Sequence, residues 1–337
     1  MFKFLDRVFL MIVISTAAVL PSSATGVPDL SFGNGGILQM EGALWSQMML
    51  KGRDEKIYVL GRGYLGTGIT QGMLVARYNP DGSLDTTYDG DGRSPLTGLI
   101  FGTISQQPDG KILFTGGPPA PAPYYDSDSM MIRLNTDGSR DLGFGTGGGV
   151  YQTNQYPGLH ERYSNPVFLP DGKIMGFIKT TTDGLSALFR FSANGTPDRS
   201  FGTRGFIQMS DLRALAAVTN NKYLFAVGST ITRIFPDMSV DTTFGTNGSI
   251  TIAGGVNSIH VMPDGRFMVN GSRTFRYSSE GVLDTTFQAT GFSIGQGPAA
   301  IFPDGRFVND GLNLYTARNS FVGTAYAVLP PTPYPII

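Results

Sequence analysis

Oxygen-bearing side chains occur at alternate positions in the segment RYNPDGSLDTTY, residues 77–88. Asn79, Asp81, Ser83 and Asp85 have the spacing at which calcium loops present ligands, because Ca²⁺ binds several carboxylate, amide and hydroxyl oxygens. No glutamate follows at the distance where such loops supply a bidentate ligand. The same residues are typical of a tight turn, in which Asp and Ser side chains accept backbone N–H bonds. The sequence therefore favours a turn over a metal site.

The other titratable residues offer few combinations for catalysis. The chain has no cysteine, which excludes disulfides, thiolate metal sites and a cysteine nucleophile. Most aspartates fall in repeated turns, and the only histidines are His160 and His260. His260 lies in SIHVMPDG, where we expect a packed strand residue rather than a catalyst. No nucleophile elbow, phosphate loop or His-rich metal motif is present, so the sequence predicts no catalytic residue and no cofactor.

Four insertions lengthen the loops, at residues 62–72, 117–129, 151–165 and 180–186, and tyrosines with polar neighbours gather in the second and third of them. The candidate binding residues in them are Tyr124, Tyr125, Asp126, Asp128, Tyr151, Tyr156, His160 and Tyr163. Variable loops on a rigid scaffold are where binding usually resides, and such side chains suit a glycan or a protein surface. The alternative is that these insertions are tolerated and have no role.

The scaffold that positions these segments is set by three markers that recur in a fixed order. The first, Asp-x-x-Phe/Tyr, pairs Asp29 with Phe32, Asp85 with Tyr88, Asp141 with Phe144, Asp198 with Phe201, Asp241 with Phe244 and Asp284 with Phe287. The second is an arginine eight residues before the aspartate, at Arg77, Arg133, Arg190, Arg233 and Arg276. The third is Pro-Asp-Gly-Lys/Arg at Pro108, Pro170, Pro263 and Pro303, with degraded copies at Arg53 and Asn220.

Between the markers the chain consists of short β-branched and aromatic segments that end at glycines, which is typical of strands. A repeat of about 45 residues with four strands is the signature of a propeller blade. Six copies predict an all-β fold, a six-bladed β-propeller of four-stranded blades whose ring is closed by the N- and C-terminal segments. We expect each arginine to pair with its aspartate across a loop joining two blades, and each aromatic residue to fill the wedge between blades.

The combination of PDGK with R-x-x-x-x-G-x-x-D-x-x-F resembles the delta-60 repeat family of exported bacterial proteins. The resemblance covers nearly all of residues 28–310, with departures at Asp54, Met238 and Asn220. It implies an exported repeat protein and implies no reaction.

The N-terminal segment of the chain predicts export. Residues 1–24 have the basic start, apolar run and small-residue end of a signal peptide, and no later segment is expected to span a membrane. Residues 25–329 form one predicted propeller domain, with repeats at approximately 33–88, 89–144, 145–201, 202–244, 245–287 and 288–329, and residues 330–337 form a Pro-rich tail. The net charge of −1 gives no electrostatic reason to expect nucleic acid as a partner.

These observations predict a periplasmic or extracellular protein that acts as a non-catalytic binding or scaffolding module at the cell envelope or outside the cell. Its expected partner is a glycan or a protein at the cell surface. The alternative hypothesis is a propeller hydrolase that acts on envelope or extracellular carbohydrate, because a fold alone does not decide activity.

Overall fold

In the computed structural model the described residues are 30–38, 40, 43–64, 71–117, 130–150, 161–164, 166–180, 185–262, 264–287, 298–301, 307–309, 313–315 and 321–324. They are almost entirely strands, with two short 3₁₀ turns, η1 (Thr219–Asn221) and η2 (Thr285–Phe287). None of the helices within this described part is long and apolar enough to cross a membrane. The expectation of an all-β chain is therefore confirmed.

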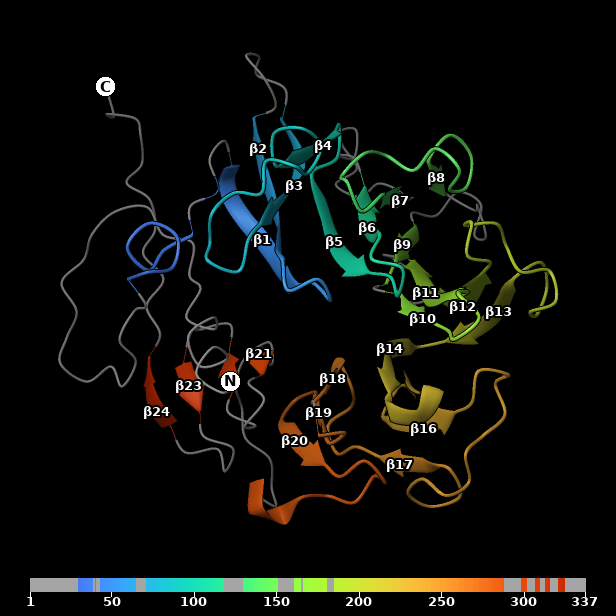
Figure 1. The fold of residues 1–337 in the computed structure, drawn as a ribbon. Helices are drawn as coiled ribbons and strands as arrows, with labels where there is room; N and C mark the ends of the chain where they lie inside the picture. The colour runs from blue at the N-terminus through green and yellow to red at the C-terminus, as the bar shows by residue number, and fades with distance from the viewer. Residues whose placement is uncertain are drawn as a thin grey trace, which may run out of the picture.

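The strands form six antiparallel sheets that follow one another along the chain (Figure 1). The first sheet contains β1 (Ala43–Lys51), β2 (Ile57–Tyr64), β3 (Gln71–Tyr78) and β4 (Arg93–Thr97). The second contains β5 (Phe101–Gln106), β6 (Ile112–Gly117), β7 (Met130–Leu134) and β8 (Gly149–Val150). The third contains β9 (Glu161–Tyr163), β10 (Val167–Phe168), β11 (Ile174–Thr180), β12 (Leu185–Phe191) and β13 (Phe206–Ser210), with both β9 and β10 paired to β11.

The fourth sheet contains β14 (Leu212–Val218), β15 (Lys222–Val227), β16 (Thr230–Ile234) and β17 (Ser249–Thr251). The fifth contains β18 (Ser258–Val261), β19 (Phe267–Asn270) and β20 (Thr274–Tyr277). The sixth contains β21 (Pro298–Ile301), β22 (Phe307–Asn309), β23 (Asn313–Tyr315) and β24 (Phe321–Thr324). Figure 1 shows the sheets arranged in turn around a common centre, and β14 of the fourth sheet contacts β10 of the third and β18 of the fifth beside it.

The core lies in wedges between neighbouring sheets. Between the first and second sheets, Tyr58 and Leu60 of β2 pack with Ile104 of β5 and Phe114 of β6. Similar clusters join the second sheet to the third, the third to the fourth and the fourth to the fifth. Alternate side chains of each strand point into one wedge, because successive side chains lie on opposite faces of a sheet. Burying one large apolar side chain in this way contributes about 1.5–3 kcal/mol.

The loop after the marker arginine connects the third strand of a sheet to the outer strand of the same sheet in the first four sheets, and does not join two blades as the sequence analysis expected. Ala76 of β3 lies opposite Arg93 of β4, so the strand after the aromatic residue is the outer strand of the same sheet. The backbone N–H of Arg77 donates to Gly92 O at 3.0 Å, and this bond returns the chain to β3. The short Pro-Asp-Gly turns and the arginine loops still share one face, because both lie at the same ends of the antiparallel strands.

Candidate functional site

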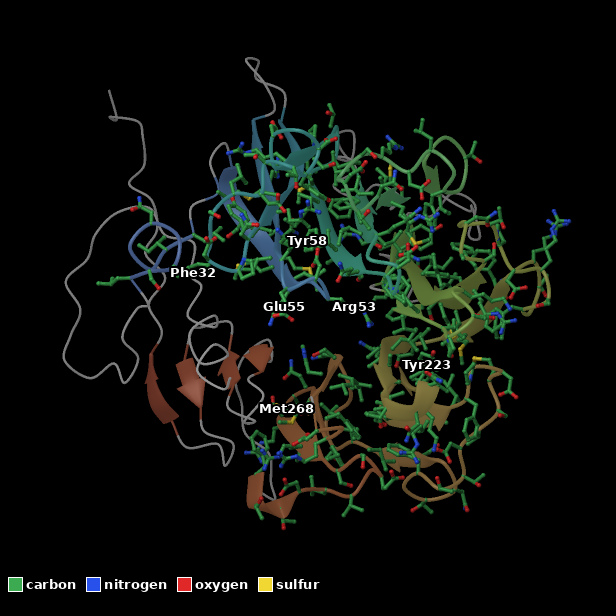
Figure 2. The ribbon with its side chains drawn as sticks, viewed as in Figure 1. Phe32, Arg53, Glu55, Tyr58, Tyr223 and Met268 are labelled. Atoms are coloured by element: carbon green, nitrogen blue, oxygen red, sulfur yellow. The ribbon has the colours of Figure 1, made fainter. Side chains whose placement is uncertain are left out.

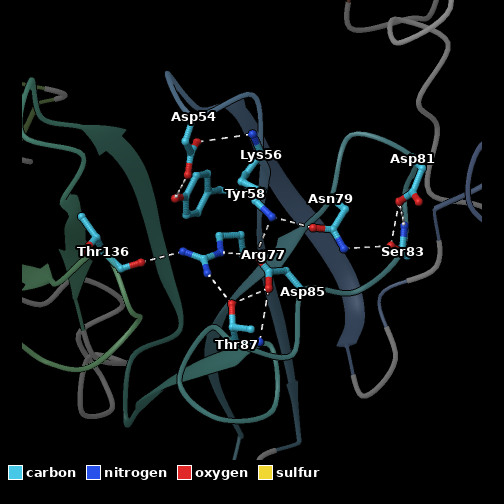
Figure 3. Close-up of polar contacts among 10 residues, drawn as sticks. All are labelled: Asp54, Lys56, Tyr58, Arg77, Asn79, Asp81, Ser83, Asp85, Thr87 and Thr136. Carbon is cyan, nitrogen blue, oxygen red and sulfur yellow. Dashed lines mark hydrogen bonds and ion pairs between the residues drawn. The ribbon is translucent and has the colours of Figure 1, made fainter.

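The first arginine loop is held by a network around one carboxylate (Figure 3). Arg77 Nε and Lys56 Nζ both lie 2.9 Å from Asp85 Oδ2, which confirms the predicted arginine–aspartate pair. Thr87 donates to Asp85 Oδ1 from its hydroxyl at 2.6 Å and its backbone N–H at 3.2 Å. Burial alone would raise the pKa of Asp85, but hydrogen bonds from Thr87 and Lys56 and the charge of Arg77 hold it well below its usual range. Both carboxylate oxygens of Asp85 therefore have partners within the loop, and the role of Asp85 is structural.

The same network recurs in the other arginine loops, residues 133–144, 190–201, 233–244 and 276–287. The arginine Nε–aspartate distances are 2.8 Å for Arg133–Asp141, 2.8 Å for Arg190–Asp198, 2.6 Å for Arg233–Asp241 and 2.9 Å for Arg276–Asp284. The second cations on these aspartates are Lys111 at 2.7 Å, Lys173 at 3.5 Å, Lys222 at 2.7 Å and Arg266 at 3.6 Å. The sequence analysis missed this role, although the basic residue that ends each Pro-Asp-Gly marker was its signal.

Each marker arginine also stacks on the aromatic residue of its own loop. The guanidinium carbon lies over the ring at 4.6 Å in Arg77–Tyr88, 4.5 Å in Arg133–Phe144, 4.5 Å in Arg190–Phe201, 4.9 Å in Arg233–Phe244 and 4.4 Å in Arg276–Phe287. All five rings are buried. Cation–π contacts of this kind contribute about 0.5–2 kcal/mol each, and more where water is excluded.

The arginines further connect neighbouring sheets. Arg77 Nη1 donates to Thr136 O at 2.6 Å, in the next arginine loop. The equivalent bonds run from Arg133 to Ala193 O, from Arg190 to Pro236 O at 3.5 Å and from Arg233 to Ser279 O at 2.6 Å. Every acceptor lies three residues after the next marker arginine. The loop is therefore repeated because each junction between sheets needs the same contact.

The aromatic residue of one loop packs under the glycine of the next. A Cβ on Gly138, whose φ is +92°, would lie 3.0 Å from the Tyr88 ring and 2.8 Å from Asp89 N. In the same way a Cβ on Gly82 would lie 2.9 Å from Phe32. Phe32 therefore occupies the position against the first arginine loop that Tyr88 occupies against the second. Its predicted partner in the marker, Asp29, lies outside the described residues.

The four calcium candidates use their side chains within the turn. Asp81 Oδ1 accepts from Ser83 N at 2.9 Å and from Ser83 Oγ at 2.7 Å. Asn79 accepts from Lys56 Nζ at 2.6 Å, and two cations already contact Asp85. In the described ranges no three His, Cys, Asp or Glu are grouped to hold a metal ion. A calcium ion would have to displace Lys56 and Arg77, so the geometry favours the turn.

Most of the predicted binding residues lie outside the described ranges: Tyr124, Tyr125, Asp126, Asp128, Tyr151, Tyr156 and His160. Tyr163 is described, and it belongs to strand β9 rather than to the insertion in which the sequence analysis placed it. Its ring meets Phe189 edge-on at 5.3 Å and Phe191 at 6.4 Å, in the wedge between the second and third sheets. Tyr163 is therefore a packing residue, because β9 continues the inner edge of its sheet.

The comparisons with known proteins agree with this architecture. A family model described as a beta-propeller domain of unknown function, DUF5122, matches residues 53–88. Prolyl oligopeptidase B from Galerina marginata is similar at a TM-score of 0.51 and 13% identity, over 84% of this chain and 41% of that enzyme. The chain has a β-propeller fold.

Other solved propellers are more distant. The calcium-binding protein regucalcin from Agrobacterium tumefaciens has a TM-score of 0.40 and 11% identity, over 73% of this chain and 75% of its own. No curated protein matches the sequence. At these identities the likeness concerns the fold alone, and the delta-60 resemblance stays a prediction.

Proposed function

We propose that the protein is an exported six-bladed β-propeller that serves as a non-catalytic binding or scaffolding module at the cell envelope or outside the cell. The observation that carries this proposal is the difference between its two faces. On one face the Pro-Asp-Gly turns and arginine loops direct their charges at each other. The opposite strand ends, called the insertion face, are the ends at which the chain enters and leaves the four insertions, residues 62–72, 117–129, 151–165 and 180–186. A ligand therefore has the insertion face available to it.

A closed ring is supported by the N-terminal segment. Phe32, Leu38 and Met40 are buried against Ile57 and Val59, on the face of the first sheet that points away from the second. The N–H of Gly33 donates to Asp81 O at 2.7 Å, as the N–H of Asp89 does to Asp137 O at 2.5 Å. The N-terminal copy of the marker thus makes the contact with the first sheet that a preceding blade would make.

The carbohydrate hydrolase is the weaker candidate, because glycoside hydrolysis needs a carboxyl group that is protonated near neutral pH. Asp85, Asp141 and Asp241 are instead held ionised by their cations. Among the described aspartates only Asp89 has a raised pKa, from burial and then from the charges of Asp91 and Asp137. Asp89 is exposed at the edge of an arginine loop, away from the insertion face.

Binding of purified residues 25–337 to an array of bacterial and host glycans tests the proposal. We expect a reproducible ligand whose binding is lost when Tyr124 and Tyr125 are both replaced by Ala. The matched control is Val282→Ser, an exposed position on the arginine-loop face at 66% exposure, which is expected to bind normally. Equal binding by all three proteins would contradict the role of the insertion face. A blank array followed by no cross-linked protein partner would contradict the binding function itself.

Export has its own test. Expression of the full chain in a bacterial host should yield a mature protein whose N-terminal residue is Thr25, recovered outside the cytoplasm. Retention of the full chain in the cytoplasm would contradict the proposed location.

A further inference from the structure

The fifth sheet presents polar side chains toward the sixth sheet, where the first and fourth sheets present apolar ones toward their next neighbours. Phe267, Val269, Phe275 and Tyr277 pack in the wedge shared with the fourth sheet. The alternate residues of these strands therefore point the other way. Met268, labelled in Figure 2, lies on that side of the sheet.

Register makes this comparison specific, because one cross-strand row can be followed in every sheet. The row is Met48–Leu60–Val75 in the first sheet, Thr103–Thr115–Met131 in the second and Ala214–Ala226–Ile231 in the fourth. In the fifth sheet the corresponding row is Ser258–Asn270–Thr274. Asn270 is 4% exposed and Thr274 is 0% exposed, so two of these polar side chains are removed from water. Burying polar groups costs free energy unless they are hydrogen-bonded, and Thr274 and Asn270 meet this requirement by bonding to each other.

A serine and a histidine form a hydrogen-bonded pair on this face. Ser258 Oγ lies 2.9 Å from His260 Nε2, and both residues are half-buried on β18, an inner strand of the ring. Burial lowers the pKa of His260, so its imidazole is neutral near pH 7 and has a nitrogen lone pair to accept a proton. A serine hydroxyl within hydrogen-bond reach of a neutral imidazole is the basic arrangement of an activated nucleophile.

Asn270 supplies the complementary donor. It lies directly opposite Ser258 in the β18–β19 register, and cross-strand partners project from the same face. Its Oδ1 accepts from Thr274 Oγ1 at 3.0 Å, which uses the amide oxygen and not the NH₂ group. An amide NH₂ beside a nucleophilic serine is a suitable donor to the oxygen that becomes negative during acyl transfer. The charged residue on this face, Arg276, is paired with Asp284 at 2.8 Å.

We propose that Ser258 is a nucleophile activated by His260, and that its substrate is a small uncharged carboxylic ester bound at this face of the fifth sheet. The Ser258 Oγ–carbonyl carbon bond forms while the hydroxyl proton passes to His260 Nε2. The carbon–oxygen bond to the alcohol then breaks, and His260 returns the proton to the departing alcohol. Water hydrolyses the acyl-serine by the same proton exchange in reverse. This activity goes beyond the proposed binding function and uses none of the insertion-face residues.

The test is reaction of the mature protein with a fluorophosphonate probe, which forms a serine Oγ–phosphorus bond and releases fluoride. We expect one adduct per chain, located by mass spectrometry on the peptide that contains Ser258. Ser258→Ala, which removes a single oxygen, should abolish the adduct. His260→Gln should slow its formation about a hundredfold, the usual contribution of a general base. Ser272→Ala, at an exposed serine of the neighbouring β19–β20 turn, is the control and should react normally.

Two results would overturn the proposal: no adduct on the folded protein, or an adduct that persists in Ser258→Ala. If His260→Gln unfolds, its loss of labelling says nothing, so the decision then rests on Ser258→Ala with an unchanged circular dichroism spectrum. Hydrolysis of p-nitrophenyl acetate is the second measurement, and its loss in Ser258→Ala is expected. A blank glycan array and no cross-linked protein partner, together with a Ser258 adduct, would contradict the binding function and support the nucleophile.

Discussion

Arg77 donates from Nη1 to the carbonyl oxygen of Thr136, 59 residues later, at 2.6 Å. The same guanidinium also binds Asp85 and lies over the ring of Tyr88. One side chain thus fixes its own loop, an aromatic residue in the wedge and the next sheet. Arginine suits this task because its planar fork offers several donors while its face stacks on a ring.

Replacing Arg133 with Met is expected to lower the free energy of unfolding by about 3 kcal/mol, since Asp141 loses a buried partner. Arg133 is 8% exposed, and its guanidinium also lies over Phe144. Urea denaturation measures the change. Arg199→Met, at an exposed position next to Asp198, is the control and should stay within about 0.5 kcal/mol of the wild type. Equal losses in the two variants would show that the arginine loops do not stabilise the fold.

Much of this fold was predictable because the sequence motif that forms the junction between sheets recurs several times. The spacing from Arg77 to Asp85 fixed a pair across one loop, and the buried rings at Tyr88 and Phe244 follow from their place in the marker. The position of that loop was not predictable from one repeat. Whether the strand after Tyr88 pairs backward with β3 or forward is decided by backbone bonds such as Arg77 N–Gly92 O.

The site was less predictable than the fold. Lys56 and Lys111 approach their aspartates only because two turns meet at one edge of a sheet, a relation between separate markers. The Ser258–His260 pair depends on side-chain direction at alternate strand positions, which no repeated motif records. Tyr163 was assigned to an insertion because no turn residue in the sequence marks the point where that insertion ends and strand β9 begins. The repeated motif therefore predicts the contacts within one loop, but not the side-chain contacts between separate markers or in the insertions.

Tyr88→Phe is expected to stabilise the protein by about 1 kcal/mol, because a buried hydroxyl without a partner costs free energy. Tyr88 is fully buried, and within the described part of the chain its hydroxyl has no hydrogen-bond partner. All four of the other arginine loops carry Phe at this position. The matched control is Tyr58→Phe, whose hydroxyl donates to Asp54 at 2.9 Å and which should lose about 1 kcal/mol. Equal melting temperatures for the two variants would contradict this account.

Glu55→Gly is expected to stabilise the protein by about 1 kcal/mol. Glu55 has a φ of 62° at the position where intact Pro-Asp-Gly turns place glycine, and a non-glycine residue in that region is strained. Its exposed ion pair with Lys51, at 2.6 Å, contributes little. Gly110→Ala, at a φ of 86°, is the opposite change and should destabilise by a similar amount. A loss of stability in Glu55→Gly would mean that the ion pair outweighs the backbone strain.

The stability of the fold is expected to fall when the pH is lowered into the acid range. Burial would raise the pKa of Asp241, but hydrogen bonds from Lys222 and Thr243 and the Arg233 partner lower it below the ordinary value of 3.8. A carboxylate with a depressed folded-state pKa stabilises the fold above its unfolded-state pKa, and that contribution is lost as the pH falls through the folded value. The contribution of Asp241 to the urea midpoint should therefore stay level from about pH 7 to 5 and decline below about pH 4. Any decline that begins near pH 6.5 is expected from His260, whose pKa burial lowers from that value.

The matched variant for this pH dependence is Asp241→Asn. It should be less stable than the wild type at neutral pH, because Arg233 and Lys222 lose their anion. Its urea midpoint should also decline less steeply in acid, since one of the titrating groups is gone. Parallel curves for the two proteins would mean that the acid decline arises from other carboxylates.

Calcium is expected to leave the melting temperature unchanged, as is a chelator. A ligand present at a hundred times its dissociation constant would stabilise the folded state by about 2.7 kcal/mol, a shift that calorimetry resolves easily. Such binding would require Asp85 to exchange Arg77 and Lys56 for the ion, and Asp81 to release Ser83. A rise in melting temperature with calcium that disappears in Asp81→Asn would restore the metal site. A rise that persists in this variant would place calcium elsewhere in the protein.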